Sequence, residues 1–220
     1  MTPQLPCPRP ARVVLAGRYA RLEPLANSHA EGLLAASLNP QSFAFLFDFA
    51  PKDIGAMRAW VARFLSAEDT VFHAVIDTAS GTVGGRQSLM RIVPEHGVIE
   101  IGNILWGLAI ARTRVATEAL FLAAKHVFDG LGYRRFEWKC NDLNEPSKHA
   151  ARRFGFTFEG VFRQHMWLKG ANRDTAWFAM LDKDWPRIRS AYERWLEPSN
   201  FDAAGRQRAV LDAAAALRRE

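Results

Sequence analysis

The sequence predicts a mixed α/β fold, a single domain built on one mixed sheet. Strand-like and helix-like segments alternate from residue 98 to residue 169, a pattern typical of strand–helix–strand crossovers. Short apolar segments joined by turns, at residues 71–77 and 83–91, indicate further strands before this region. The chain has 220 residues and 49% hydrophobic content, which suits one domain with a full core.

The strand at residues 98–106 changes the parity of its apolar side chains. Ile99 and Ile101 share one face, whereas Ile104 and Trp106 carry the apolar role on even positions. A strict period of two does not allow this change. A bulge at residues 102–103 would allow it and would free backbone groups for another partner. The alternative is that a glycine at position 102 only fits a crowded sheet.

A helix is predicted at residues 113–131, directly after this strand. Its buried stripe has helical spacing and consists of Ala116, Leu120, Ala123, Val127 and Leu131. Thr113 is the expected N-cap, and a glycine at 130 or 132 ends the element. A helix start presents unpaired N–H groups, and two arginines, Arg112 and Arg114, flank it. The junction therefore predicts a seat for a phosphorylated ligand.

The next segments predict a strand at 133–140, a helix from 144 to 154 and another strand from 156. Asn144 suits the N-cap of this helix, and Gly155 ends it. The strands at 98–106 and 133–140 should lie side by side and parallel because of the right-handed crossover rule.

The rest of the chain is organised around this centre. We predict strands at 17–25, 71–77 and 83–91, a hairpin of 156–169 with 175–181, and helices to residue 36, at 51–65 and at 187–196. Residues 1–16 are expected to be a flexible N-terminal segment, and residues 17–198 the domain. Residues 199–220 are expected to contain an amphipathic helix at 201–220 that packs on the domain or mediates assembly, for example as a homodimer.

Motifs in this order resemble the GNAT superfamily of N-acetyltransferases, in particular its RimJ/RimL-type branch. The resemblance covers about residues 17–186. It is carried by Glu-Ile-Gly at 100–102, Thr-Glu-Ala at 117–119, Lys-Cys at 139–140, Asn-Glu-Pro-Ser at 144–147, Ala-Arg-Arg at 151–153 and Phe-Thr-Phe-Glu-Gly at 156–160. It implies the GNAT-type acyl-CoA N-acyltransferase fold with a splayed, bulged central strand.

The resemblance also implies a role for each matching position. The backbone of Asn103, Ile104 and Leu105 would pair with the pantetheine arm of acetyl-CoA. Asn144 would hydrogen-bond the pantetheine, and Ser147 would protonate the departing thiolate. Backbone N–H groups would hold the pyrophosphate, from Ala111, Arg112, Thr113, Arg114 and Val115.

The chain departs from the family pattern at three places. The small residues of the usual phosphate loop are replaced by Arg112 and Arg114. Their backbone could still approach the phosphates if both residues keep helical dihedrals. The alternative is that their long side chains reach the pyrophosphate or the 3′-phosphate. Ala151 and Met166 stand where a family tyrosine acid and a RimL-type glutamate would fall.

The family pattern therefore does not supply the general base. Our first choice is Glu100, acting through a water, because it lies on the bulged strand opposite in parity to its apolar neighbours. An ordinary solvated or ion-paired glutamate is the alternative. His165 and Glu118 are weaker candidates.

The expected function is acetyl-CoA-dependent N-acetylation of a primary amine by direct attack in a ternary complex. A catalytically silent acyl-CoA-binding or sensor module is the alternative. The acceptor would be a peptide N-terminus or a small amino compound. Its pocket would be bordered by the aromatic segment 43–49 and the hairpin 164–177.

Composition bounds the other partners. The formal net charge of +6 suits the acidic cofactor. Basic residues are scattered, which argues against specific nucleic-acid binding, and no apolar run has membrane-spanning length. The histidines lack ligand spacing, so no metal site is expected, and the N-terminal decapeptide lacks a signal core, so a cytoplasmic location is expected.

Overall fold

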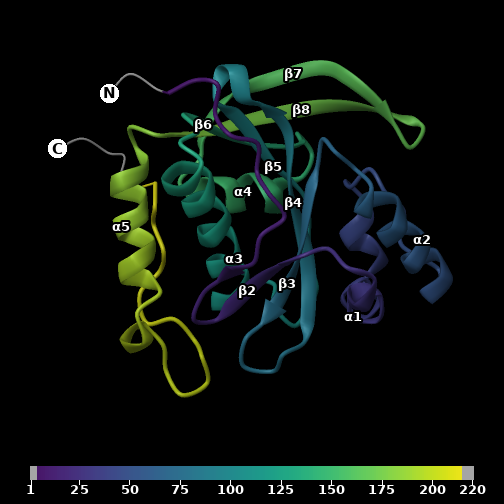
Figure 1. The fold of residues 1–220 in the computed structure, drawn as a ribbon, viewed down its shortest axis with the longest axis horizontal. Helices are drawn as coiled ribbons and strands as arrows, with labels where there is room; N and C mark the ends of the chain where they lie inside the picture. Colours follow the sequence, from purple (N-terminus) through teal and green to yellow (C-terminus); the bar gives the residue numbers. More distant parts are fainter. Residues whose placement is uncertain (1–3, 215–220) are drawn as a thin grey trace.

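The fold is a mixed α/β arrangement of one eight-stranded sheet with helices on both faces (Figure 1). The computed structural model describes residues 4–214. The strand order is β1-β2-β3-β4-β5-β6-β8-β7. The strands are β1 (Leu15–Ala16), β2 (Ala20–Pro24), β3 (Val71–Asp77), β4 (Val83–Val93), β5 (Val98–Trp106), β6 (Arg135–Asn141), β7 (Thr157–Leu168) and β8 (Ala171–Leu181). This confirms the predicted fold class.

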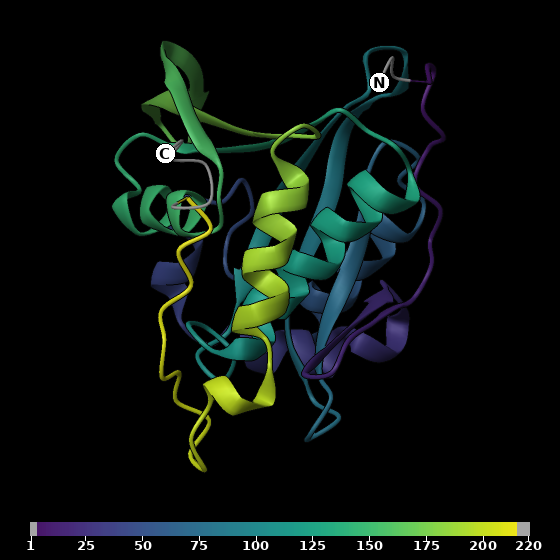
Figure 2. The ribbon, with the colours of Figure 1, turned by 90° about the vertical axis from the view of Figure 1, so that its left-hand side faces the viewer.

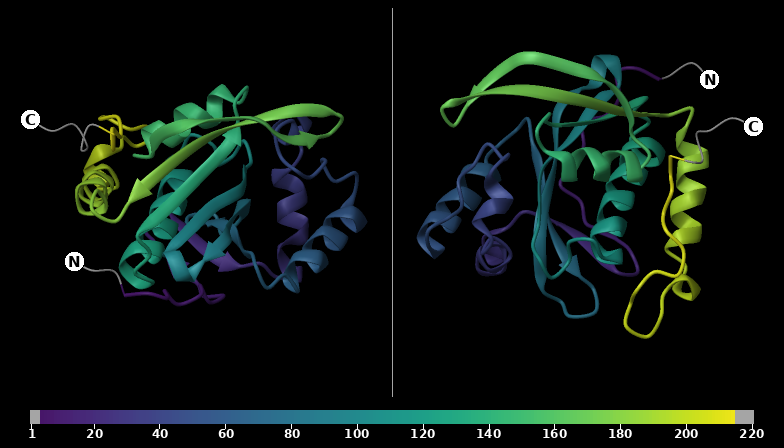
Figure 3. Two further views of the ribbon diagram at one scale, coloured as in Figure 1. Left: turned by 90° about the horizontal axis from the view of Figure 1, so that it is seen from above. Right: turned by 180° about the vertical axis from the view of Figure 1, so that it is seen from behind.

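The helices form two layers. They are α1 (Ala30–Ala36), α2 (Ile54–Leu65), α3 (Arg114–Lys125), α4 (Glu145–Arg153) and α5 (Trp185–Trp195). Helices α1 and α2 cover one face of the sheet, while α3 and α5 cover the other (Figure 3). Helix α3 continues into a π-helical turn at His126–Gly130, so the predicted helix at 113–131 is confirmed over nearly its full length.

Strands β5 and β6 are a parallel pair, as the crossover rule predicts. They pair from Val98 with Arg135 to Ile101 with Trp138. The paired register ends there, although β5 runs on to Trp106 and β6 to Asn141. The two strands therefore separate beyond Ile101 and leave backbone groups of β5 without a strand partner on that side.

The predicted bulge is present in β5. Between two paired positions, β5 advances from Gly102 to Leu105 while β4 advances only from Arg86 to Ser88, so β5 holds one extra residue. The left-handed residue of the bulge is Asn103, with φ of 52°. Asn103 Nδ2 donates to Ser88 Oγ at 3.1 Å, and Ser88 Oγ donates to the Gly102 carbonyl at 3.1 Å. Asparagine tolerates this conformation better than most residues do.

Gly102 has a separate reason to be glycine. A Cβ at this position would lie 2.5 Å from Met90 Sδ, so the sheet is crowded there. The bulge and the crowded sheet, which the sequence offered as alternatives, therefore both hold.

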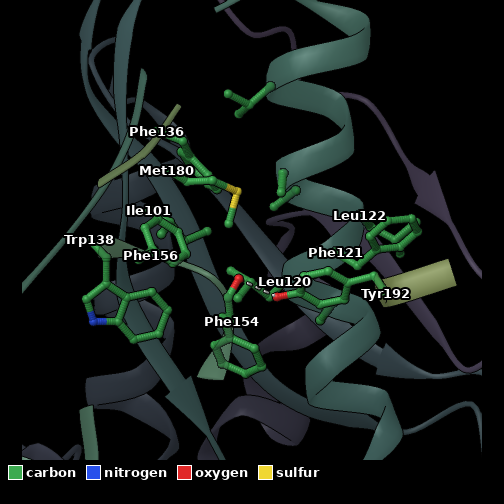
Figure 4. Close-up of a cluster of buried hydrophobic side chains, with 14 of the residues drawn as sticks. Ile101, Leu120, Phe121, Leu122, Phe136, Trp138, Phe154, Phe156, Met180 and Tyr192 are labelled. Carbon is green, nitrogen blue, oxygen red and sulfur yellow. Dashed lines mark hydrogen bonds between the residues drawn. The ribbon is translucent and has the colours of Figure 1, made fainter. Parts of the chain in front are cut away.

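The main core lies between the sheet and helices α3 and α5, and aromatic rings fill much of it (Figure 4). Tyr192 of α5 is fully buried, and its ring stacks on Phe121 of α3 with centroids 5.3 Å apart. Its hydroxyl donates to the Phe154 carbonyl at the end of α4, at 3.2 Å (Figure 4). The Tyr192 side chain of α5 therefore contacts both α3 and the end of α4. These contacts hold α3 and α4 in position beside the separated strands.

The amphipathic helix predicted at 201–220 is wrong over residues 201–214, and residues 215–220 lie outside the described part. The segment forms an isolated bridge between Phe201 and Gln207 and then runs alongside α5 (Figure 2). Gly205 has φ of 74°, which no α-helix accommodates. Trp195 Nε1 donates to Gln207 Oε1 at 3.1 Å and to the Ala209 carbonyl at 3.0 Å. Tertiary contacts have replaced helical hydrogen bonds.

The N-terminal segment has no helix or strand from residue 4 to residue 14. Cys7 is nevertheless buried, and its backbone N–H donates to the Pro94 carbonyl at 3.0 Å. The segment therefore packs on the domain at this point, while the division of the chain at residue 16 stays a prediction.

Candidate active site

A cavity of about 800 Å³ opens where β5 and β6 separate. One half is bordered by the bulge of β5 and by the first turns of α3 and α4. The other half is bordered by the aromatic segment, here residues 45–47, and by the β7–β8 hairpin, which arches over the sheet toward α2 (Figure 1). We call these the junction half and the hairpin half.

Most of the predicted site residues line this cavity. They are Glu100, Asn103, Ile104, Leu105, Ala111, Arg112, Asn144 and Ser147. Thr113, Arg114 and Val115 do not line it. The structure therefore brings these residues together in one cavity, and the residues that it leaves out all lie at the start of α3.

Three of the five backbone donors predicted at the start of α3 are already used, those of Ala111, Thr113 and Val115. Thr113 caps the helix, since its Oγ1 accepts from Val115 N at 3.2 Å. Ala111 N donates to the Gly107 carbonyl at 2.9 Å and Thr113 N to the Ile110 carbonyl at 3.1 Å. Within residues 4–214, the N–H groups of Arg112, Arg114 and Ala116 have no protein acceptor. These three are the donors open to an anion.

The side chains of the two junction arginines point to different places. Arg112 lines the cavity, and its φ of 64° turns the chain into the helix. The Arg114 guanidinium lies over the Tyr19 ring, 4.4 Å from its centroid, and also near the Phe201 ring. The alternative that both side chains reach the phosphates is therefore wrong for Arg114. Its cation–π contacts hold it on the other side of α3.

Arg153 also lines the cavity, although the sequence did not indicate it as a site residue. It lines the junction half from α4, and its Nη1 donates to Thr117 Oγ1 of α3 at 3.3 Å. Burial lowers its pKa, and no described carboxylate lies within 4 Å of it. The available signal was helical spacing, because Pro146, Ala150 and Arg153 lie on one face of α4.

The start of α4 is held by side-chain hydrogen bonds. Asn144 is the N-cap, as predicted, because its Oδ1 accepts from Ser147 N at 3.2 Å. Ser147 Oγ accepts from Trp138 Nε1 of β6 at 3.0 Å. The indole bond fixes the Ser147 oxygen in the cavity, and its hydroxyl lies within hydrogen-bonding reach of the Cys140 sulfur.

Glu100 is buried at the boundary of the two halves and is ion-paired. Its Oε2 lies 2.9 Å from Lys139 Nζ and 3.5 Å from Arg91 Nη1. Burial raises the pKa of Glu100, and the two cations partly offset this effect. Glu100 is therefore ion-paired, as one of the two sequence interpretations expected. The residue nevertheless lines the cavity, so a role as base stays a prediction.

The two weaker candidates for the general base, Glu118 and His165, have different environments. Glu118 is a structural residue, since its carboxylate accepts from the backbone N–H groups of Arg18, Tyr19 and Ala20. His165 lines the hairpin half, and its buried Nδ1 has no hydrogen-bond partner in the described structure. Burial lowers the pKa of His165, and Arg91, Arg173 and Lys139 lower it further, so the ring is neutral near pH 7.

The hairpin and the aromatic segment are joined over the cavity. Lys169 Nζ donates to the Phe43 and Asp48 carbonyls, both at 2.7 Å. Phe45, Leu46 and Phe47 then face the same cavity as His165, Met166 and Arg173. Both segments predicted to border an acceptor pocket therefore line one space.

A family model for the acetyltransferase (GNAT) domain matches residues 20–157. The chain belongs to the GNAT family of acetyltransferases. A GCN5-related N-acetyltransferase from Brucella melitensis is 52% identical in sequence, with a TM-score of 0.92, covering 94% of this chain and 96% of that one. A probable GNAT acetyltransferase from Chromobacterium violaceum is 37% identical, with a TM-score of 0.77, covering 82% and 91%. None of the curated proteins searched matches.

The likeness to RimL is more distant. RimL, a ribosomal L7/L12 alpha-N-protein acetyltransferase solved with coenzyme A, is 21% identical, with a TM-score of 0.66, covering 77% of this GNAT chain and 99% of RimL. At this identity the likeness shows the fold alone. Among the described residues, no helix is long and apolar enough to cross a membrane, and no group of three His, Cys, Asp or Glu side chains could hold a metal.

Proposed function

We propose that this GNAT acetyltransferase transfers an acetyl group from acetyl-CoA directly to a primary amine. The observation that carries the proposal is the cavity at the separated strands, which is lined by a half-buried bulge in β5 and has free backbone N–H groups at the start of α3. GNAT enzymes use acetyl-CoA, which supplies the acetyl thioester.

The junction half has the chemistry that coenzyme A requires. The backbone of Asn103 to Leu105 would hold the pantetheine arm, and the Asn144 amide would add a hydrogen bond. The three free N–H groups, with the Arg112 and Arg153 side chains, would hold the phosphates. The half-buried Arg153 has no described carboxylate within 4 Å, and the exposed Arg112 adds a second positive charge, so this half of the cavity favours an anionic ligand.

Glu100 and Ser147 are the proposed acid–base residues. Glu100 would accept the proton of the acceptor ammonium through a water, and Ser147 would give a proton to the departing thiolate. The raised pKa of Glu100 suits a base that works near neutral pH. His165 is the second candidate base. It lines the hairpin half, where we expect the acceptor, and its ring is neutral with an Nδ1 that has no hydrogen-bond partner in the described structure.

The proposed acceptor is a peptide α-amine or a small amino compound, in line with the RimJ/RimL-type resemblance. The cytoplasm as location and a homodimer as assembly remain predictions from the sequence.

The test is an acetylation panel of N-terminal peptides, amino acids, polyamines and aminoglycosides, followed by mass spectrometry. Transfer to nitrogen of one class, with stoichiometric release of coenzyme A, is the expected result. Tight acetyl-CoA binding with no transfer to any amine would instead favour a catalytically silent binding module. Transfer to oxygen alone would contradict the proposal.

A further inference from the structure

Arg173 is a buried cation in the hairpin half of the cavity. Its side chain comes from β8, and the residue is only 5% exposed. The guanidinium lies over the Phe47 ring, 4.9 Å from its centroid, and Nε donates to Thr175 Oγ1 at 3.3 Å. Arg173 and Thr175 both line the cavity. The Arg173 side chain is therefore held in place, and its two terminal nitrogens make no hydrogen bond within the described residues.

No described carboxylate neutralises Arg173. The other strongly buried cations of the sheet each have one, since Lys139 Nζ lies 2.9 Å from Glu100 and Arg86 Nη2 lies 3.4 Å from Asp48. Ion pairs within 4 Å do not include Arg173 anywhere in residues 4–214. A buried guanidinium without a counter-charge is unfavourable, so its charge indicates an anionic ligand that the protein itself does not supply.

The neighbouring titratable groups do not supply that negative charge. Glu100 is engaged by Lys139 and Arg91. Burial raises the pKa of the Cys140 thiol, which keeps the thiol neutral near pH 7. His165 and Arg91 add no negative charge. The hairpin half consequently holds more cationic than anionic side chains.

Arg173 is also separate from the proposed phosphate seat. The seat lies at the start of α3 with Arg112 and Arg153, whereas Arg173 projects from the hairpin that closes the opposite half. The thioester would lie between them, near Glu100 and Ser147. An anion at Arg173 would therefore belong to the acceptor.

We propose that Arg173 binds a carboxylate of the acceptor, so that the acceptor is an amine that also carries a carboxylate. This inference rests on the proposed function. The planar guanidinium, held by Phe47 and Thr175, offers its terminal nitrogens for two parallel hydrogen bonds to a carboxylate. The carboxylate would come from a free amino acid or from an acidic side chain near a peptide N-terminus.

The experiment compares acceptors that differ only in a carboxylate. One pair is a free amino acid and its amide. The other pair consists of peptide amides with Asp or Asn at the second position. The enzymes are wild type, Arg173→Gln, Arg173→Lys and the control Arg163→Gln, an exposed arginine on β7 of the same hairpin. The measurement is kcat and KM from coenzyme A release, with circular dichroism to check folding.

Wild type should prefer the carboxylate member of one pair by about ten- to hundredfold in kcat/KM, mainly through KM. A preference within the amino-acid pair would identify a free amino acid as the source of the carboxylate. A preference within the peptide pair would identify an acidic side chain. Arg173→Gln should lose the preference while keeping its affinity for acetyl-CoA, Arg173→Lys should keep part of it, and Arg163→Gln all of it. Equal kcat/KM within both pairs in wild type, or a preference that survives in Arg173→Gln, would overturn the inference.

Failure of the proposed function would look different. If no amine is acetylated, calorimetry with coenzyme A present can still compare an N-acetyl amino acid with its amide. Binding of the carboxylate that is lost in Arg173→Gln would support the subsite without the transferase activity. Absence of carboxylate binding to wild type would overturn it.

Discussion

At the scale of single residues, the charged side chains that line the cavity differ in whether an oppositely charged side chain lies within 4 Å. Glu100 has two cations within 3.5 Å, while Arg173 and Arg153 have no described carboxylate within 4 Å. The sequence identified Glu100 because strand parity is a local signal. It did not identify Arg153 or Arg173, because whether an arginine is paired depends on strands and helices that are distant in sequence.

Replacing Glu100 by Gln should lower kcat by about 10²- to 10⁴-fold, the usual contribution of a general base. In wild type the rate should fall as the pH drops through the pKa of Glu100, because a protonated carboxyl cannot accept a proton. Burial raises this pKa, so the acid limb should lie above that of an ordinary glutamate.

The matched control is Glu68→Gln, an exposed glutamate remote from the cavity lining, which should leave the profile unchanged. If Glu100→Gln retains the wild-type acid limb, the base is another group. The same profile measured for His165→Gln would then decide whether His165 takes that role.

At the scale of elements, some features of the start of α3 follow from its local sequence and others do not. The bulge, the helix and its Thr113 cap were predictable because each rests on a few consecutive residues. Which backbone donors remain free was not predictable, since it depends on the turn at Gly107 and Ile110. The direction of the Arg114 side chain was likewise set by Tyr19 and Phe201, far away in the chain.

Arg112→Gln and Arg153→Gln should each weaken acetyl-CoA binding by about tenfold, because each removes a charged donor near the phosphates. The affinity of the wild type should fall as salt is raised, and less steeply in either variant. Calorimetry at two salt concentrations measures both effects.

Arg114→Gln is the informative comparison, since its guanidinium lies on aromatic rings outside the cavity. Its affinity for acetyl-CoA should stay within about twofold of wild type, although its stability should decrease through loss of the cation–π contacts. A large loss of affinity in Arg114→Gln with none in Arg112→Gln would move the phosphate site away from the cavity.

At the scale of the whole molecule, the C-terminal segment is part of the domain rather than a separate helix. The sequence pattern predicted one amphipathic helix, yet in the structure Phe201, Leu211 and Ala213 are buried from an extended path beside α5, while Val210 is exposed (Figure 2). Periodicity cannot separate these outcomes when a glycine with positive φ and tertiary hydrogen bonds interrupt the segment.

Leu211→Ala should therefore destabilise the protein by about 2–3 kcal/mol, the cost of removing a buried leucine side chain. Leu211 is 3% exposed, whereas its neighbour Val210 is 70% exposed and provides the control Val210→Ala. Urea denaturation measures both. Equal and small effects would show that the segment does not dock in solution.

The central claim is that the space between the separated strands holds acetyl-CoA with its thioester beside Glu100 and Ser147. A crystal structure of the protein with coenzyme A tests it most directly. We expect the pantetheine along residues 103–105, the pyrophosphate at the free N–H groups of Arg112 and Arg114, and the sulfur near Ser147 Oγ. Coenzyme A bound elsewhere, for example in the second cavity between the aromatic segment and α2, would contradict it.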